Sequence, residues 1–125
     1  MKFNNSMPIY KQVIDKIKAD IISGRVKLGD KMPSTRDLAK ELGINPNTAT
    51  RIYKEMESQG ICYKKRGLGT FITESATTVN EIKVDMANSL TADFVQGMIK
   101  LGFSYEEMVK LVLQKKAIML EDYNE

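Results

Sequence analysis

Residues 34–60 read STRDLAKELGINPNTATRIYKEMESQG and hold two helical patterns separated by a short turn. Ser34, with Asp37 three residues later, resembles a capping box, so a helix is expected to begin there. Gly43 is a suitable stop for it, because glycine tolerates the left-handed backbone that commonly ends a helix. The apolar positions of this helix, which predict its buried face, are Leu38, Ala39 and Leu42.

The second pattern begins at Asn45 and Pro46, which suit the N-cap and the first position of a helix. Gly60 marks its end. Its inward face is predicted to consist of Ala49, Ile52, Tyr53 and Met56. Two short helices joined by so tight a turn must lie close together, which predicts a helix-turn-helix.

The flanking segments extend this prediction. A first helix follows Pro8, carries apolar residues at helical spacing from Ile9 to Ile22, and stops at Gly24. Residues 25–33 are rich in turns and leave open a small strand. After Gly60 two short strands are expected, at 61–64 and 70–73, joined by a basic, glycine-rich hairpin tip. The fold class is therefore mainly α with a small β-wing, and residues 1–74 form a winged helix-turn-helix domain.

The remaining residues, 75–125, have a different pattern. Residues 74–78 have the composition of a linker, and a long helix with a narrow apolar seam is expected from Val79 to Leu101. Ser104 and Glu107 form a second capping box ahead of a final helix. Because a long seam has little of its own chain to cover it, these two helices are expected to form a homodimer. The alternative is that the tail folds back on its own winged helix. The residues assigned to dimerisation are Ile82, Met86, Leu90, Phe94, Met98, Met108, Leu111 and Val112.

Charge and composition separate the two parts and exclude several functions. Residues 1–73 carry 14 Lys/Arg and 7 Asp/Glu, whereas residues 74–125 carry 5 Lys/Arg and 9 Asp/Glu. A basic N-terminal part suits a polyanion such as duplex DNA. The chain has no histidine and one cysteine, so neither a catalytic site nor a metal site of the usual kind is expected, and no cofactor is implied. The absence of a long apolar run or signal region predicts a cytoplasmic chain without membrane contact.

The third helix carries an unusual set of polar residues at its N-terminal end: Asn47, Thr48, Thr50 and Arg51. Asn, Arg and Thr can all contact base edges in a major groove. A solvated helix surface is the alternative, but the helix-turn-helix context favours DNA. Arg36 lies in the first turn of its helix, where a cation opposes the helix dipole, so either a DNA phosphate or an acid such as Asp30 or Asp37 is expected beside it.

The hairpin tip is the other basic element. Lys64, Lys65 and Arg66 precede Gly67 and are suited to follow phosphates or to reach a minor groove. A plain solvated hairpin is the alternative.

The motifs of the helix-turn-helix and its flanking segments resemble those of the GntR family of bacterial regulators. The resemblance rests on Pro8-Ile9-Tyr10, on residues 24–29, 32–39 and 43–48, on Tyr53, Glu57 and Gly60, and on residues 66–71. It implies DNA contacts at Arg36, Asn47, Thr48, Thr50, Arg66 and Gly67, and less directly at Asn45 and Arg51. Lys65 is added from its place in the basic hairpin.

The short tail is similar to that of the YtrA-type branch of this family. That resemblance implies a tail that mainly dimerises and control of an adjacent transporter operon. A two-fold dimer would place its recognition helices about 34 Å apart over a palindromic operator. Repression by occupying a promoter is the expected action. A small-molecule effector is left open. The two alternatives to a DNA-binding regulator are a protein-binding module and an enzyme. The polar third helix and the basic hairpin argue against the first, and the sequence has no constellation of catalytic residues for the second.

Overall fold

The computed structural model describes the backbone of residues 1–124 and the side chains of residues 1–122. It contains two compact units, Met1–Val84 and Asp85–Glu125. The division lies inside a helix, ten residues beyond the domain boundary that the sequence predicts at residue 74. None of the helices in the described part of the chain is long and apolar enough to cross a membrane.

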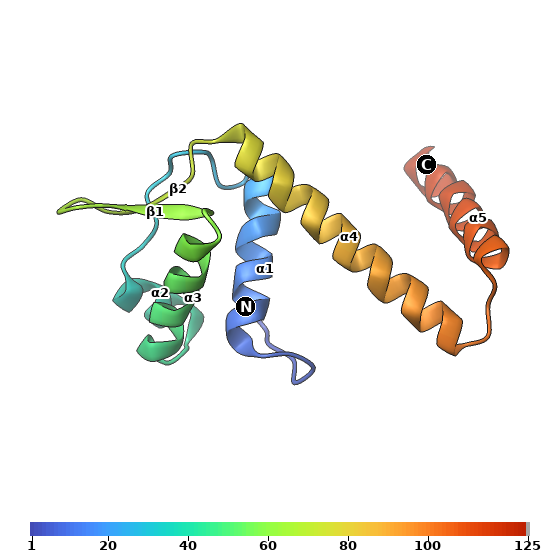
Figure 1. Cartoon of the computed structure of the whole chain (residues 1–125), viewed down its shortest axis with the longest axis horizontal. Coiled ribbons are helices and arrows are strands. Elements are labelled where there is room, and N and C mark those ends of the chain that lie inside the picture. The colour runs from blue at the N-terminus through green and yellow to red at the C-terminus, as the bar shows by residue number, and fades with distance from the viewer. Residues whose placement is uncertain (125) are drawn as a thin grey trace. The chain divides into compact units, whose positions relative to one another are not determined.

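The first unit begins with three helices, α1 (Ile9–Ile22), α2 (Thr35–Leu42) and α3 (Pro46–Ser58) (Figure 1). Ser34 caps α2 by accepting a hydrogen bond from the Asp37 amide at 3.1 Å. Gly43 then ends α2 with φ of +64°, in the left-handed region. Asn45 caps α3 and Pro46 occupies its first turn. The helix-turn-helix and its caps are therefore confirmed.

The core of this unit is made where α1, α2 and α3 meet the wing. Its fully buried side chains include Ile52 and Met56 of α3, together with Ile61 and Ile72 beside the strands. The Tyr53 hydroxyl donates a hydrogen bond to the Pro33 carbonyl and so ties α3 to the segment that precedes α2. Burial raises the pKa of Tyr53 well above its usual range, which keeps this donor protonated.

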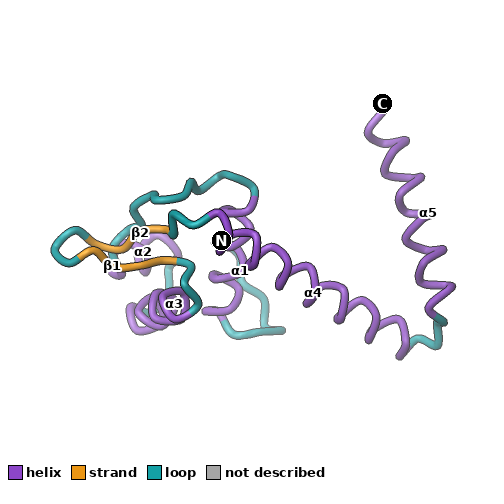
Figure 2. The backbone as a smooth tube through the Cα atoms, turned by 45° about the horizontal axis from the view of Figure 1, so that its top comes forward, coloured by secondary structure: helices purple, strands orange, loops and turns teal. Residues whose placement is uncertain are grey.

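The wing is a two-stranded antiparallel sheet of β1 (Cys62–Lys65) and β2 (Gly69–Ile72), which projects from the helices in Figure 2. Within the sheet, Tyr63 pairs with Phe71. Both strands begin and end one residue away from the predicted bounds of 61–64 and 70–73. The strand left open within residues 25–33 is reduced to one bridge, between Lys31 and Phe71. The bridge brings this segment beside the wing.

The remaining helices are α4 (Ala76–Lys100) and α5 (Tyr105–Asn124). The linker expected at residues 74–78 was wrong in part, because α4 already begins at Ala76. The Ser75 hydroxyl accepts a hydrogen bond from the Thr78 amide at 3.2 Å, which caps this first turn. The capping box of α5 is complete, since the Ser104 and Glu107 side chains accept from each other's amides at 3.2 and 3.0 Å. This bonding lowers the pKa of Glu107.

Candidate nucleic-acid interface

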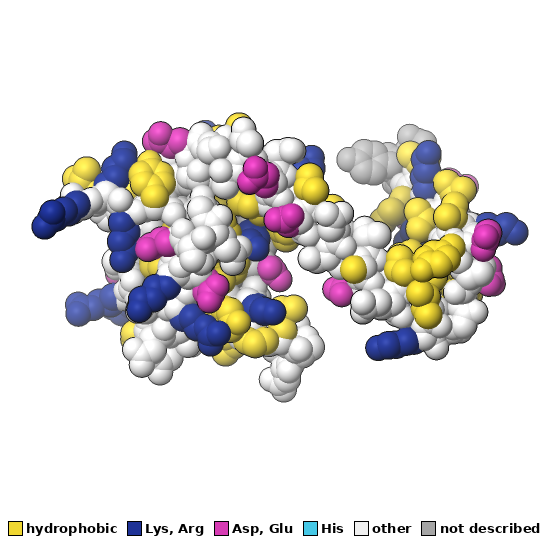
Figure 3. Space-filling view, viewed as in Figure 1, with side chains coloured by type: hydrophobic (Ala, Val, Ile, Leu, Met, Phe, Trp, Pro, Cys, Tyr) yellow, Lys and Arg dark blue, Asp and Glu magenta, His cyan; other side chains and the backbone are white. Residues whose placement is uncertain are grey.

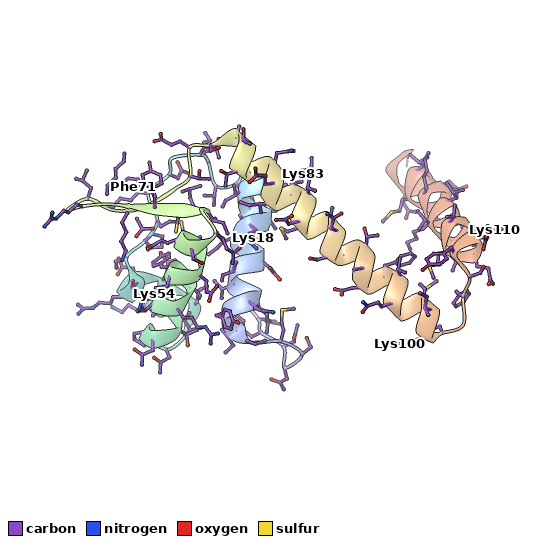
Figure 4. All side chains as sticks on the ribbon, in the orientation of Figure 1. Lys18, Lys54, Phe71, Lys83, Lys100 and Lys110 are labelled. Atoms are coloured by element: carbon purple, nitrogen blue, oxygen red, sulfur yellow. The ribbon has the colours of Figure 1, made fainter. Side chains whose placement is uncertain are left out.

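The exposed side of α3 presents a row of polar and basic residues. Asn47, Arg51 and Lys54 are all exposed and are spaced by four and three residues, so they share one side of the helix. The opposite side is buried in the core. Lys54, which Figure 4 labels on α3, was missed by the sequence analysis, although its spacing of seven residues from Asn47 was a usable signal.

The candidates at the start of α3 differ in how far the helix itself uses them. The Asn45 side-chain oxygen accepts from the Asn47 amide at 2.8 Å, and the Thr50 hydroxyl donates to the Pro46 carbonyl at 3.1 Å. Thr48 is half-buried. Asn45 and Thr50 are therefore partly committed to the helix, whereas the Asn47 side chain has no hydrogen bond among the described residues.

Arg36 lies at the N-terminal end of α2, where it is exposed. In the described part of the chain the salt bridges are Lys16–Asp20 and Lys64–Glu57, so neither Asp30 nor Asp37 neutralises Arg36. Asp30 instead accepts a hydrogen bond from the Lys27 amide at 2.8 Å. The sequence leaves either a DNA phosphate or an acidic side chain open as the partner of Arg36. Among the described residues, no acidic side chain takes this place.

A groove of about 650 Å³ separates the N-terminal end of α2 from the wing. It is lined by Lys31, Met32, Pro33, Ser34, Thr35, Asp37, Tyr53, Leu68, Gly69 and Thr70. The Lys31 Cε atom lies so close to the wing that it would be 3.1 Å from a Cβ atom built on Gly69. Lys31 is thus a second basic residue that the sequence analysis missed, because its pairing with the wing depends on tertiary structure.

The wing divides its cations between two faces. Tyr63 and Phe71 stack with ring centres 6.1 Å apart, and the Lys65 Nζ atom lies 4.7 Å from the Phe71 ring centre. Lys64 points to the other side, where its Nζ atom is 3.8 Å from Glu57 Oε1. Arg66 and Gly67 form the exposed tip between the strands. Cation–π contact restrains Lys65 and leaves its charge unneutralised.

The residues assigned to dimerisation fall into two groups. Met108 is 3 % exposed, and Ile82, at the end of the first unit, is 7 % exposed, so the chain itself already covers both. Leu90 is 69 % exposed and Val112 is 54 % exposed. Leu111 and Phe94 are also exposed, and Met86 and Met98 are half-buried. A groove of about 790 Å³ between α4 and α5 has mostly apolar walls, formed by Phe94, Leu111, Val112, Lys115, Lys116, Met119, Leu120 and Asp122.

The surface properties of the two units differ accordingly. Figure 3 shows Lys and Arg side chains gathered over the helices and wing of the first unit, and apolar side chains gathered over the second. A three-helix core, a second and third helix joined by a tight turn, and a basic two-stranded wing define a winged helix-turn-helix of the DNA-binding class.

The comparisons with known proteins agree. The family model of the bacterial regulatory proteins, gntR family, matches residues 9–72, and the chain belongs to this family. It is 41% identical over 109 residues to the uncharacterized HTH-type transcriptional regulator YhcF of Bacillus subtilis, covering 87% of this chain and 90% of that protein. It is 47% identical over 83 residues to the HTH-type transcriptional repressor YtrA of the same organism, covering 66% of this chain and 64% of that one.

A solved structure gives the same result for the fold. A GntR family transcriptional regulator from Listeria monocytogenes superposes with a TM-score of 0.81 at 38% identity, covering 90% of this chain and 98% of that chain. The match extends well beyond the winged helix. The protein is therefore a DNA-binding transcriptional regulator of the GntR family, similar to its YtrA-type members.

Proposed function

We propose that this regulator is a homodimeric repressor that occupies a palindromic operator, with α3 in the major groove and the wing on the flanking backbone. The observation that carries the proposal is the row of Asn47, Arg51 and Lys54 on the exposed side of α3. An Asn side chain can pair with adenine, and an Arg side chain can pair with guanine or a phosphate. Lys54 adds a cation suited to the backbone.

Four further basic residues complete the proposed surface around this row. Arg36 at the start of α2 has no acidic partner among the described residues, and a DNA phosphate would supply one. Lys65 and Arg66 lie on the wing and at its tip, where a backbone or minor groove contact is within the reach of long side chains. Lys31, beside Gly69, joins the same basic edge.

The dimer part of the proposal rests on the second unit. Among the described side chains of that unit, Met108 is the one buried apolar residue, while Leu90, Leu101 and Val112 are more than half exposed. A pair of helices with so little covered apolar surface lacks a core of its own, and a two-fold partner would supply one. Such a dimer would present two α3 helices to half-sites about 34 Å apart, one turn of DNA.

The repressor part of the proposal follows from occupancy of the promoter by the dimer. A dimer bound across a promoter would exclude polymerase, and the name of the similar protein YtrA includes the word repressor. An adjacent transporter operon is the target that the YtrA-type resemblance implies, and its transcript level in a deletion strain tests this point. Because the proposed ligand is chromosomal DNA, the proposal includes a cytoplasmic location.

Fluorescence anisotropy over a range of salt concentrations tests DNA binding. The probe is the duplex upstream of the protein's own gene, and a scrambled duplex of equal length is the control. We expect tight binding to the upstream duplex alone, with Asn47→Ala costing about 1–3 kcal/mol of binding free energy. Lys54→Ala should reduce the salt slope by about one, whereas Lys110→Ala on α5 should not change it. Equal, weak binding to both duplexes would contradict the proposal for this operator.

Sedimentation equilibrium tests the dimer. Leu90→Asp places a charge on a 69 % exposed apolar position of α4 and should yield monomers. Asn88→Asp adds the same charge two residues away, on a different side of the helix, and should remain dimeric. A dimeric Leu90→Asp variant would remove this residue from the interface.

A further inference from the structure

A contact between α1 and α3 links a residue outside the helix-turn-helix to the proposed recognition surface. Tyr10 lies in the first turn of α1, and the Arg51 Cζ atom lies 3.7 Å from the centre of its ring. This distance is well inside the range of a cation–π contact, which extends to about 6 Å. The two residues are far apart in sequence, so only the folded chain brings them together.

The stack orients Arg51 without consuming its hydrogen-bond donors. An Arg side chain has many rotamers, and a planar guanidinium that lies on a ring is confined to few of them. Its N–H groups point outward from the edge of the plane and stay available. Among the residues that the structure describes, Arg51 forms no salt bridge, so the ring is the contact that restrains it.

The position of Arg51 makes this restraint relevant to recognition. Arg51 shares the exposed side of α3 with Asn47 and Lys54, and it lies one helical turn after Asn47. Tyr10 itself is half-buried, so α1 anchors the ring while one surface of it is presented to Arg51. A guanidinium held in place before binding loses less rotamer freedom when it meets DNA.

We propose that Tyr10 is a positioning residue for DNA recognition, which holds the Arg51 guanidinium ready on the groove-facing side of α3. The inference rests on the proposed placement of α3 in the major groove. It assigns the first turn of α1 a part in binding that goes beyond packing. A residue that only packs α1 against α3 would change DNA binding by the same factor whether or not Arg51 is present.

A double-mutant cycle separates these two roles. The full chain and its Tyr10→Leu, Arg51→Ala and doubly substituted variants are titrated against the tightest duplex that the wild-type chain selects from a randomised library. We expect Tyr10→Leu to weaken binding about two- to fivefold, the equivalent of one exposed cation–π contact. The same substitution should have no effect when Arg51 is already Ala. Tyr10→Phe, which keeps the ring, should bind like the wild type.

Two results for Tyr10→Leu would overturn the inference. One is an equal loss for Tyr10→Leu in both backgrounds, with all variants folded at the assay temperature, and the other is no loss in either. If Arg51→Ala binds normally while Asn47→Ala does not, the groove placement of α3 stands and the role of Tyr10 fails. If neither substitution weakens binding to the selected duplex, the proposed function fails first.

Discussion

Replacing Asn45 by Ala removes the cap of α3 and tests whether this residue serves the helix or the DNA. Its side-chain oxygen accepts from the Asn47 amide at 2.8 Å, and loss of an N-cap typically costs about 1 kcal/mol. Because Asn47 is exposed, water can satisfy the released amide, so no penalty for a buried unpaired donor is added. We therefore expect the melting temperature to fall by about 4–8 °C, as for a domain of 60–100 residues.

The assay is thermal unfolding of the full chain followed by circular dichroism, together with DNA titration at a temperature where all variants are folded. Asn45→Ser is the matched control, because a serine hydroxyl can also cap a helix. We expect serine to restore both stability and DNA affinity. Equal melting temperatures for the Ala variant and the wild type would refute the capping argument. A Ser variant that is stable but binds DNA weakly would show that Asn45 contacts DNA directly.

Four other substitutions test the core, two glycine positions and the buried thiol. Ile52→Ala empties a position with 0 % exposure and should cost about 2–5 kcal/mol in urea unfolding, so a cost below about 1 kcal/mol would contradict the assigned core. Gly43→Ala forces a Cβ atom into a backbone with φ of +64° and should lower the free energy of unfolding by about 1 kcal/mol. Gly97 lies inside α4, where a Cβ atom has open space, so Gly97→Ala should raise the free energy of unfolding by a similar amount. Burial raises the pKa of the Cys62 thiol from 9.0 to about 12, so the folded chain retains a proton that the unfolded chain loses. Stability should therefore fall between pH 9 and pH 12, with a smaller slope in Cys62→Ala.

The helix-turn-helix was predictable because its signals are local. Ser34, Gly43 and Asn45 act on amides or backbone angles within three residues of themselves. The start or end of each helix can therefore be predicted from neighbouring residues alone. The capping box of α5 is a second case of the same kind. By contrast, the start of α4 was misread, because the Ser and Thr residues of a capped first turn have the same composition as a linker.

Features that depend on contacts between distant residues were not predictable in this way. The stack of Arg51 on Tyr10 and the approach of Lys31 to Gly69 need the assembled core. The apolar seam of α4 also looked uniform in sequence, but Ile82 is covered by the chain itself while Leu90 is 69 % exposed. A periodic pattern identifies the apolar side of a helix, and only the fold determines which part of that side is already occupied.

The sparse burial in α4 and α5 has a consequence for the lifetime of the protein in the cell. Leu101, Val109 and Leu113 are more than half exposed on the single chain, and such apolar segments are the features that chaperones and proteases bind. If opening of these helices is fast, degradation follows the population of open chains. If the proposed dimer forms, a copy without a partner would then be cleared sooner than a dimeric one, and the cellular amount of this regulator would be adjusted after its synthesis.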